Sequence, residues 1–210
     1  MATTPMTRRT GRRPGKTETR DAILRIAQSR FRDSGYGVVS LRAIAREADV
    51  DPSLITHFFG SKAGLFVAAF ELPLDPAEVV ARTLAGPAAR AGRCVIEIFL
   101  ECWREEAGRN QILMLLDQAT SDPQAASLLH EFLIEDMLMP LVDALGGDMP
   151  RLRAGLVSAQ LTGIGLSRYR YGLVSPSEVD DERLIDAVAP TLQRYLTGSL
   201  VDEAECRSHE

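Results

Sequence analysis

Residues 52–59 combine an apolar side with a side of small and polar groups, at the spacing of one short helix. Ile55, Phe58 and Phe59 recur at helical intervals and form the apolar side. The opposite side carries groups that donate or accept hydrogen bonds or that permit close approach. Such a surface fits the major groove of DNA, where base edges present donors and acceptors. The candidates for contact with bases are Pro52, Ser53, Thr56 and His57.

Two cations and one hydroxyl flank this segment and suit contacts with phosphate groups. Arg42 lies in the first turn of a preceding helix, and Lys62 begins a following one. A lysine at a helix N-terminus opposes the helix dipole, whereas a phosphate docked there would be attracted by both the lysine and the free backbone N–H groups. Ser40 is expected to cap the preceding helix and is a further candidate for DNA contact. The alternative for each cation is a solvated surface charge.

Two short helices, 41–48 and 52–59, are expected to position these side chains as a helix-turn-helix. Asp49 stands at the sharp turn between them, where aspartate tolerates left-handed backbone better than most residues. Val50 would fill the corner, and Pro52 suits the first position of the second helix. The inner face of the first helix would consist of Ile44, Ala45 and Ala48. Many helical pairs share this spacing, so an interaction with protein is an open alternative to DNA binding.

Residue types that carry catalysis or hold metals are sparse and scattered. The three histidines stand at 57, 130 and 209, and the three cysteines, at 94, 102 and 206, include no Cys-x-x-Cys pair. No serine elbow or phosphate-binding loop is present. Residues 163–165 (Gly-Ile-Gly) lack the preceding strand of a dinucleotide loop and are expected to serve close helix packing. We therefore expect neither an enzyme nor a metal or cofactor site, and a reducing compartment, the cytoplasm.

Charge is divided unevenly along the chain. Residues 1–70 hold 12 Lys and Arg against 6 Asp and Glu, whereas residues 71–210 hold 12 against 23. This division indicates that only the N-terminal part meets phosphate. Residues 1–16 are expected to be a disordered basic arm, which either enters a minor groove or only adds screened attraction. No apolar run approaches the roughly 18 residues that a membrane span needs, so no membrane partner is expected.

The hydrophobic pattern predicts an all-α protein with two domains. No segment shows the sustained two-residue alternation of a strand. Residues 72–76 (Leu-Pro-Leu-Asp-Pro) cannot continue a helix and mark the boundary. We expect a three-helix N-terminal domain at 17–72, a second helical domain at 76–200 and a flexible tail at 201–210. Further helices are predicted at about 62–72, 88–106, 110–120, 123–145, 150–172 and 180–197, with kinks or breaks at Pro140 and Pro190.

The N-terminal segment from 17 to about 72 resembles the DNA-binding domain of the tetracycline-repressor (TetR) family. The resemblance rests on the end of the first helix, on residues 40–45 and 48–50, and above all on the run from His57 to Phe66, His-Phe-Phe-Gly-Ser-Lys-Ala-Gly-Leu-Phe. It implies a homodimeric transcription regulator, most simply a repressor, that binds a palindromic operator. Two positions depart from the family: Asp49 replaces the usual Gly, and Thr56 replaces a Tyr that commonly touches phosphate.

The same resemblance implies that the C-terminal domain dimerises and holds a small-molecule effector. The effector would contact Phe99, Cys102, Trp103, Met114, Leu115 and Gln118. Dimerisation would use the helices near 123–145 and 150–172, with Leu129, Phe132, Leu133, Met137, Gln160, Leu161, Ile164 and Gly165 as candidates. The alternatives are that these side chains form an ordinary core, that the regulator needs no ligand, or that the chain is a helical protein-interaction module.

Overall fold

The computed structural model describes residues 16–174 and 178–200, and every regular element in these ranges is helical. The N-terminal group, here called the head, comprises α1 (Lys16–Ser34), α2 (Leu41–Glu47), α3 (Pro52–Phe59) and α4 (Lys62–Ala69). The basic arm and the C-terminal tail expected from the sequence lie outside the described residues, apart from Lys16. The all-α prediction is confirmed.

Local sequence signals set the ends of the head helices. Gly35, with φ of +82°, ends α1 in the left-handed region. Ser40 and Ser61 cap α2 and α4, because their hydroxyls accept hydrogen bonds from the backbone N–H groups of Ala43 and Gly64. The expected turn is also present: Asp49 has φ of +53°, and the Val50 N–H donates to the Ala45 carbonyl at 3.0 Å.

Helix α4 ends at Ala69, three residues earlier than the sequence pattern predicts. Glu71 takes a left-handed backbone with φ of +53°, and the Leu72 N–H donates to the Val67 carbonyl at 2.9 Å. These features terminate the helix before the proline-containing linker begins, so Leu72 leaves the helix and packs beneath it.

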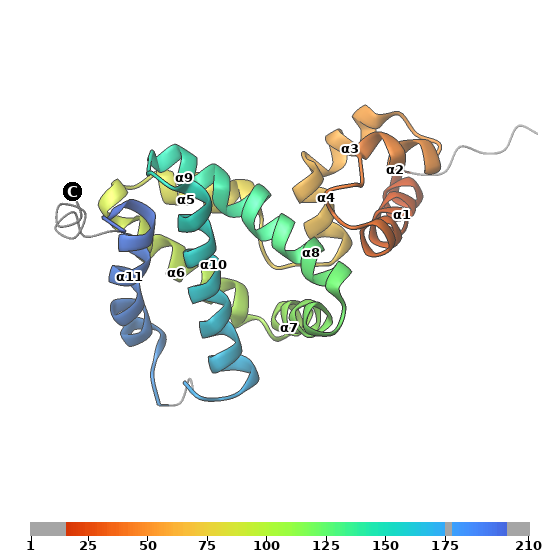
Figure 1. Ribbon diagram of the computed structural model, residues 1–210. Coiled ribbons are helices and arrows are strands. Elements are labelled where there is room, and N and C mark those ends of the chain that lie inside the picture. The colour runs from red at the N-terminus through yellow and green to blue at the C-terminus, as the bar shows by residue number, and fades with distance from the viewer. Residues whose placement is uncertain (1–15, 175–177, 201–210) are drawn as a thin grey trace, which may run out of the picture.

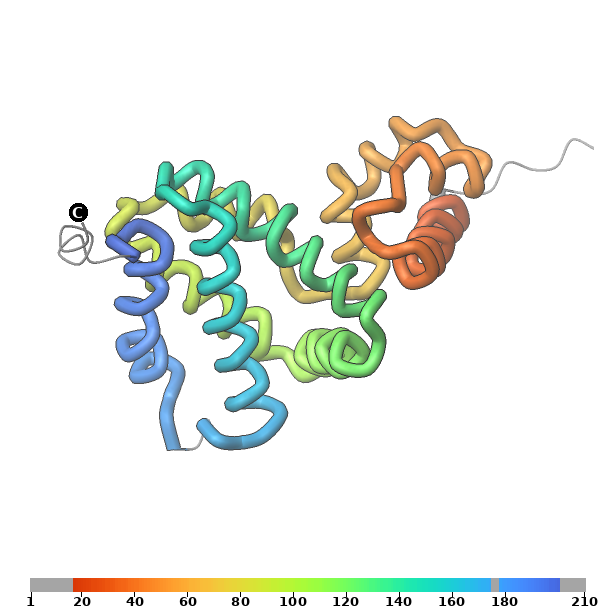
Figure 2. Tube along the Cα trace, viewed as in Figure 1, coloured from red at the N-terminus to blue at the C-terminus, as the bar shows by residue number. Residues whose placement is uncertain are grey.

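The second group, here called the body, comprises the helices that follow this linker. Figure 1 shows α8 leaving the side of the head and running on into the body, with α10 and α11 side by side beyond it. The tube in Figure 2 follows the same path. The elements are α5 (Pro76–Leu84), a 3-10 turn (Ala88–Arg90), α6 (Ala91–Arg104), α7 (Glu106–Ser121), α8 (Pro123–Glu131), α9 (Met139–Leu145), α10 (Pro150–Gly165) and α11 (Asp181–Thr197).

Wide π-helical turns join α8 to α9, over Phe132–Leu138, and extend α10 over Leu166–Arg170. The first of these lies directly before Pro140, whose missing N–H leaves a carbonyl of the preceding turn without its donor. The predicted disturbance at Pro140 is therefore present as a π segment. At Pro190 the predicted break does not occur, since α11 continues through it.

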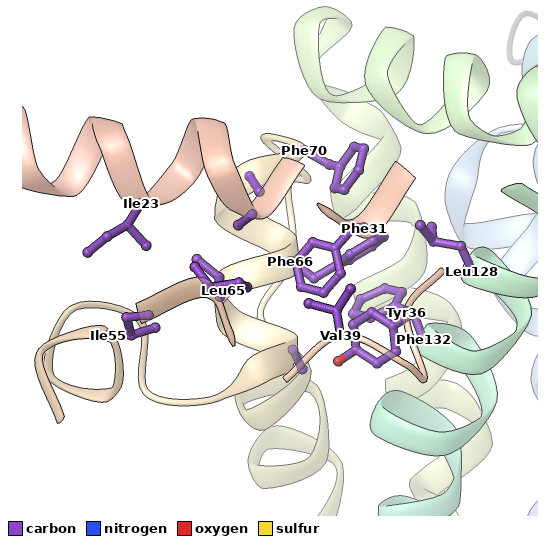
Figure 3. Close-up of a cluster of buried hydrophobic side chains, with 14 of the residues drawn as sticks. Ile23, Phe31, Tyr36, Val39, Ile55, Leu65, Phe66, Phe70, Leu128 and Phe132 are labelled. Carbon is purple, nitrogen blue, oxygen red and sulfur yellow. The ribbon is translucent and has the colours of Figure 1, made fainter. Parts of the chain in front are cut away.

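Two apolar cores hold the chain. The head core is rich in aromatic rings: Phe31, Tyr36, Phe66 and Phe70 lie within 6.5 Å of a neighbouring ring centroid. Phe132 from the body enters the same cluster, with its ring centroid 4.6 Å from that of Phe66 (Figure 3). The head core is thus completed by the body, and the two groups share one packed cluster.

The body core is aliphatic, and two buried arginines stabilise its ends. Arg153 donates to the carbonyls of Tyr195 and Gly198 at 2.8 and 2.9 Å and pairs with Asp148. Arg168 donates to the Val179 carbonyl and pairs with Asp181, each at 2.8 Å. Because a buried cation is costly without partners, these bonds fix both ends of α10 and its π extension against the start and the end of α11. Among the described residues, no helix is both long and apolar enough to cross a bilayer.

Candidate nucleic-acid interface and internal cavity

The outer side of α3 matches the side predicted from the sequence. Ile55 is fully buried in the head core, which fixes the rotation of the helix. The four candidates for base contact, Pro52, Ser53, Thr56 and His57, are all exposed. The geometry therefore presents a polar surface on a helix whose other side is anchored.

Ser53 also forms two hydrogen bonds to Asp51, the residue that caps α3. Asp51 caps α3 by accepting from the Ser53 backbone N–H at 2.8 Å, and it also accepts from the Ser53 hydroxyl at 2.5 Å. These hydrogen bonds lower the pKa of Asp51 below its ordinary value. Because the hydroxyl proton is directed to Asp51, the Ser53 oxygen is left as an acceptor, suited to a donor such as the exocyclic amine of adenine or cytosine.

The predicted phosphate residues differ in their availability. Ser40 and Arg42 are exposed at the start of α2, with Ser40 serving as the cap. Lys62 is half-buried: its Nζ lies 4.3 Å from the centroid of the Tyr36 ring and donates to the Gly37 carbonyl at 3.4 Å. Burial lowers the pKa of Lys62, although the negative charges of Asp136 and Glu131 act in the opposite direction. Lys62 would have to leave the Tyr36 ring to reach a phosphate.

Sequence reasoning missed the two carboxylates that face this lysine. Glu131 and Asp136 belong to the body, and the Glu131 carboxylate packs against the backbone of Gly37. Burial raises the pKa of the Tyr36 hydroxyl, as does the neighbouring Asp136 carboxylate, although no hydrogen bond of good geometry joins them. Some 70 residues separate Lys62 from these carboxylates in the chain, so no local sequence pattern could have predicted their proximity. We call the group formed by Lys62, Tyr36, Glu131 and Asp136 the Lys62 corner.

A partly open apolar cavity of about 130 Å³, here called the body cavity, lies between the two cores and has walls from both. Four residues predicted to contact an effector, Phe99, Cys102, Trp103 and Leu115, lie in its wall. Met114 and Gln118 do not: Met114 is 45% exposed, and Gln118 lines a separate surface hollow beside Arg32 and Asp122. Helix α7 turns Ile112, Leu115 and Leu116 toward the cavity, and five consecutive apolar residues at 112–116 concealed this rotation from sequence analysis.

Two models of known families match the chain, one over each group of helices. Residues 23–69 match the model described as bacterial regulatory proteins of the tetR family. Residues 89–196, more than half of the chain, match the model described as a tetracyclin repressor-like C-terminal domain. The chain belongs to the TetR family. Regulators of this family are DNA-binding transcription factors and not enzymes, so the polar side of α3 belongs to a DNA-binding helix-turn-helix.

Solved structures of TetR-family regulators resemble the chain over most of its length. A regulator from Streptomyces coelicolor A3 is 29% identical, with 89% of this chain and 98% of that chain covered and a TM-score of 0.45. A regulator from Rhodococcus sp. Rha1 is 21% identical, with 87% and 98% covered and a TM-score of 0.43. NalD of Pseudomonas aeruginosa, described as the secondary repressor of a multidrug efflux pump, is 22% identical, with 87% and 98% covered and a TM-score of 0.42. Comparison with curated protein sequences gives no match.

Several residues expected at a TetR-type dimer interface lie inside this chain instead. Phe132 is 1% exposed within the head core, so its assignment to an interface is wrong. Gly165 packs against Trp103, where a Cβ would come within 2.6 Å of the indole ring. Four further candidates line the cavity: Leu129, Leu133, Met137 and Leu161. Helix 123–145 thus packs its apolar side against the head and the cavity, and of the interface candidates only Gln160 and Ile164 border an outer groove.

Proposed function

We propose that this TetR-family protein is a cytoplasmic homodimeric repressor that binds a palindromic operator and is released by a small molecule held in the body cavity. The exposed polar side of α3 on an anchored helix carries the DNA-binding part of the proposal. Head (17–72) and body (76–200) would then be the DNA-binding and the ligand-binding and dimerisation domains, respectively.

Within the proposed DNA complex, α3 enters the major groove and the start of α2 lies against the backbone. Pro52, Thr56 and His57 face base edges, and Ser53 accepts a hydrogen bond from a base. Arg42 and Ser40 hold phosphate, and Lys62 joins them after leaving the Tyr36 ring. Base contacts set the preferred sequence, whereas phosphate contacts set the strength of binding and its dependence on salt.

The outer side of α10 and α11 supports a dimer in the arrangement expected of the family's last two long helices. The groove between them is lined by Leu156, Ala159, Gln160, Gly163, Ile164, Ser167, Val174, Leu184 and Tyr195. A Cβ added at Gly163 would meet nothing within 4 Å, so a second helix could approach closely there. A two-fold dimer would place two recognition helices on successive major grooves, about 34–36 Å apart or a multiple of that distance.

Phe132 supports a path from the cavity to the head. It lines the cavity and also packs against Phe66 of α4, so a ligand that moved Phe132 would disturb the packing of the head. A ligand shifts the equilibrium between a DNA-binding and a DNA-free arrangement only if it binds one of them more tightly. A displacement of Phe132, which contacts both the cavity and Phe66, would make the two affinities differ.

Selection of genomic fragments by the purified protein tests DNA binding directly. We expect a palindromic fragment whose affinity falls steeply with salt. His57→Ala should cost about 1–3 kcal/mol and relax preference at one position of each half-site, whereas His130→Ala, exposed on α8, should change neither. Arg42→Ala should weaken all sequences alike and reduce the salt slope. If no fragment is retained at low salt, the alternative function, a helical protein-interaction module, becomes the better explanation of the fold.

Light scattering tests the dimer. Gly163→Glu places a charge in the groove without an internal clash and should give a folded monomer. Gly86→Glu, also in open space, is the matched control and should stay dimeric. A wild-type protein that is monomeric at micromolar concentration would contradict the proposal.

A further inference from the structure

We infer that the body cavity takes a small, uncharged and mainly hydrophobic molecule of about one aromatic ring, with a single hydroxyl-type group held by Ser158 and Thr162. This inference rests on the proposed effector site and names the chemistry of its ligand. Its grounds are the size of the cavity, the lack of charge in its wall, and two hydroxyl groups whose hydrogen-bonding capacity is unused.

Size sets the first limit. The cavity measures about 130 Å³, and a dry apolar cavity of about 150 Å³ is known to accept benzene in another protein. Many sites for drug-sized ligands are larger, at roughly 300–1,000 Å³. The side chains of Phe99 and Trp103, whose ring centroids lie 5.6 Å apart, provide flat surfaces in the wall. A monocyclic ligand matches this space.

Charge sets the second limit. Among the described residues that line the cavity, none is Asp, Glu, Lys, Arg or His. An ion moved from water into such a space loses its hydration and finds no counter-charge, which is strongly unfavourable. A neutral ligand avoids that loss, so the wall selects against carboxylates and ammonium ions alike.

A polar hollow adjoins the cavity and strengthens the discrimination against anions. The two spaces share Leu74, Val79, Ile98 and Cys102 in their walls. In the hollow, Arg82 is already paired with Glu101 through two hydrogen bonds of 2.7 and 3.0 Å. Asp75 and Glu78 add further negative charge there. An approaching anion would therefore be repelled before it reached the apolar interior.

Two hydroxyls give the ligand a point of attachment. Ser158 and Thr162 are four residues apart on α10, so they lie on the same side of the helix, and both line the cavity. Serine and threonine inside a helix often donate to a carbonyl of the preceding turn. Within the described part of the chain, neither side chain makes a hydrogen bond, so both are available to a ligand hydroxyl, which can donate to one and accept from the other.

The test is a matched set of ligands of one shape: benzyl alcohol, toluene, benzylammonium and benzoate. Calorimetry and thermal shift on the full chain should give the order benzyl alcohol, then toluene, with both ions at least about a hundredfold weaker. Equal or tighter binding of benzoate or benzylammonium would overturn the uncharged class. If none of the four compounds bound, the inference that the cavity accepts a ligand of about one aromatic ring would be overturned.

A double variant tests the attachment point. Ser158→Ala with Thr162→Val should weaken benzyl alcohol by about fivefold while leaving toluene unchanged. Retained toluene binding shows that the variant is folded and the cavity intact. An unchanged preference for the alcohol would overturn the role of the two hydroxyls.

Operator binding in the same samples separates this inference from the proposed function. Release of DNA by benzyl alcohol supports both. Tight, selective binding of the alcohol without DNA release keeps the ligand class and overturns the effector role. If the protein binds operator but none of the four ligands, the proposed DNA-binding function is supported and the inference about the cavity ligand is overturned.

Discussion

The two apolar cores of this chain are filled in different ways. The head core is closed by interlocking rings, with Phe31, Tyr36, Phe66 and Phe132 in edge-on, tilted or stacked contact (Figure 3). The body core consists mainly of aliphatic side chains, and the cavity lies between the two cores with walls from both. Large rings hold α1 and α4 against Phe132 of the body, whereas the core of the body is packed from shorter aliphatic side chains. The aromatic core thus lies beneath the proposed DNA-binding helices, and the aliphatic core borders the proposed ligand site.

The largest effect is expected from opening the ring-filled core. Phe66→Ala removes a fully buried ring and should lower the free energy of unfolding by up to about 5 kcal/mol. Urea denaturation followed by circular dichroism measures this change. Val38→Ala, at a side chain that is 80% exposed, is the control and should stay within about 0.5 kcal/mol of wild type. A loss below about 1 kcal/mol at Phe66 would show that the head core repacks readily.

The body should instead depend on a buried charge. Arg153→Met leaves Asp148 and two carbonyls without their donor and should cost about 3 kcal/mol in the same assay. Arg151→Met, two residues earlier and with its side chain 71% exposed, is the matched control. Equal costs at the two positions would mean that burial of Arg153 contributes nothing to the body.

The reactivity of the Cys102 thiol reports how far solvent reaches the cavity wall. Burial, with a smaller contribution from Glu101, raises the pKa of Cys102 to about 11. In a Cys94→Ser, Cys206→Ser background, labelling at pH 8 should be roughly a hundredfold slower than in urea, where the thiol has its ordinary pKa of about 8.5. The rate should rise as the pH approaches the folded pKa. Because the thiol of the unfolded chain ionises at a lower pH than that of the folded chain, the free energy of unfolding should fall as the pH rises from about 8.5 to about 11. Fast labelling at pH 8 would mean that water reaches the Cys102 thiol, from the cavity or from the adjoining polar hollow.

The smallest effect concerns the Lys62 corner. Asp136→Asn removes negative charge that faces Lys62 and should free the lysine for phosphate, which we expect to raise operator affinity by about two- to fivefold. Fluorescence anisotropy with labelled operator measures this. Glu135→Gln, in the same π segment but paired with Arg151, controls for the general change in charge. The gain should disappear in a Lys62→Ala background, and equal gains from Asp136→Asn and Glu135→Gln would contradict a specific contact.

Sequence predicted the parts of the molecule that local chemistry determines. The cap at Ser40 and the left-handed turn at Asp49 each depend on residues within a few positions, and both are present. The exposure of the α3 candidates followed from helical spacing alone.

Features that depend on distant partners could not be predicted in this way. The position of Phe132 inside the head core depends on how helix 123–145 packs against the head, and the placement of Lys62 depends on carboxylates from the body. At 112–116 the apolar run has no gap, so its periodicity cannot say which residues face inward. Met114 and Gln118, which were predicted to contact an effector, lie outside the cavity.

The shared ring cluster also limits how this protein can be rebuilt. A hybrid regulator joined at the proline linker would carry the head without Leu115, Leu128 and Phe132, which occupy its core from the far side of that linker. The graft would leave a gap beside Phe66 and Tyr36 unless the new body supplied side chains of similar shape. The exchangeable unit is therefore discontinuous in sequence: the helices of the head together with Leu115 of α7, the end of α8 and the ring that follows it.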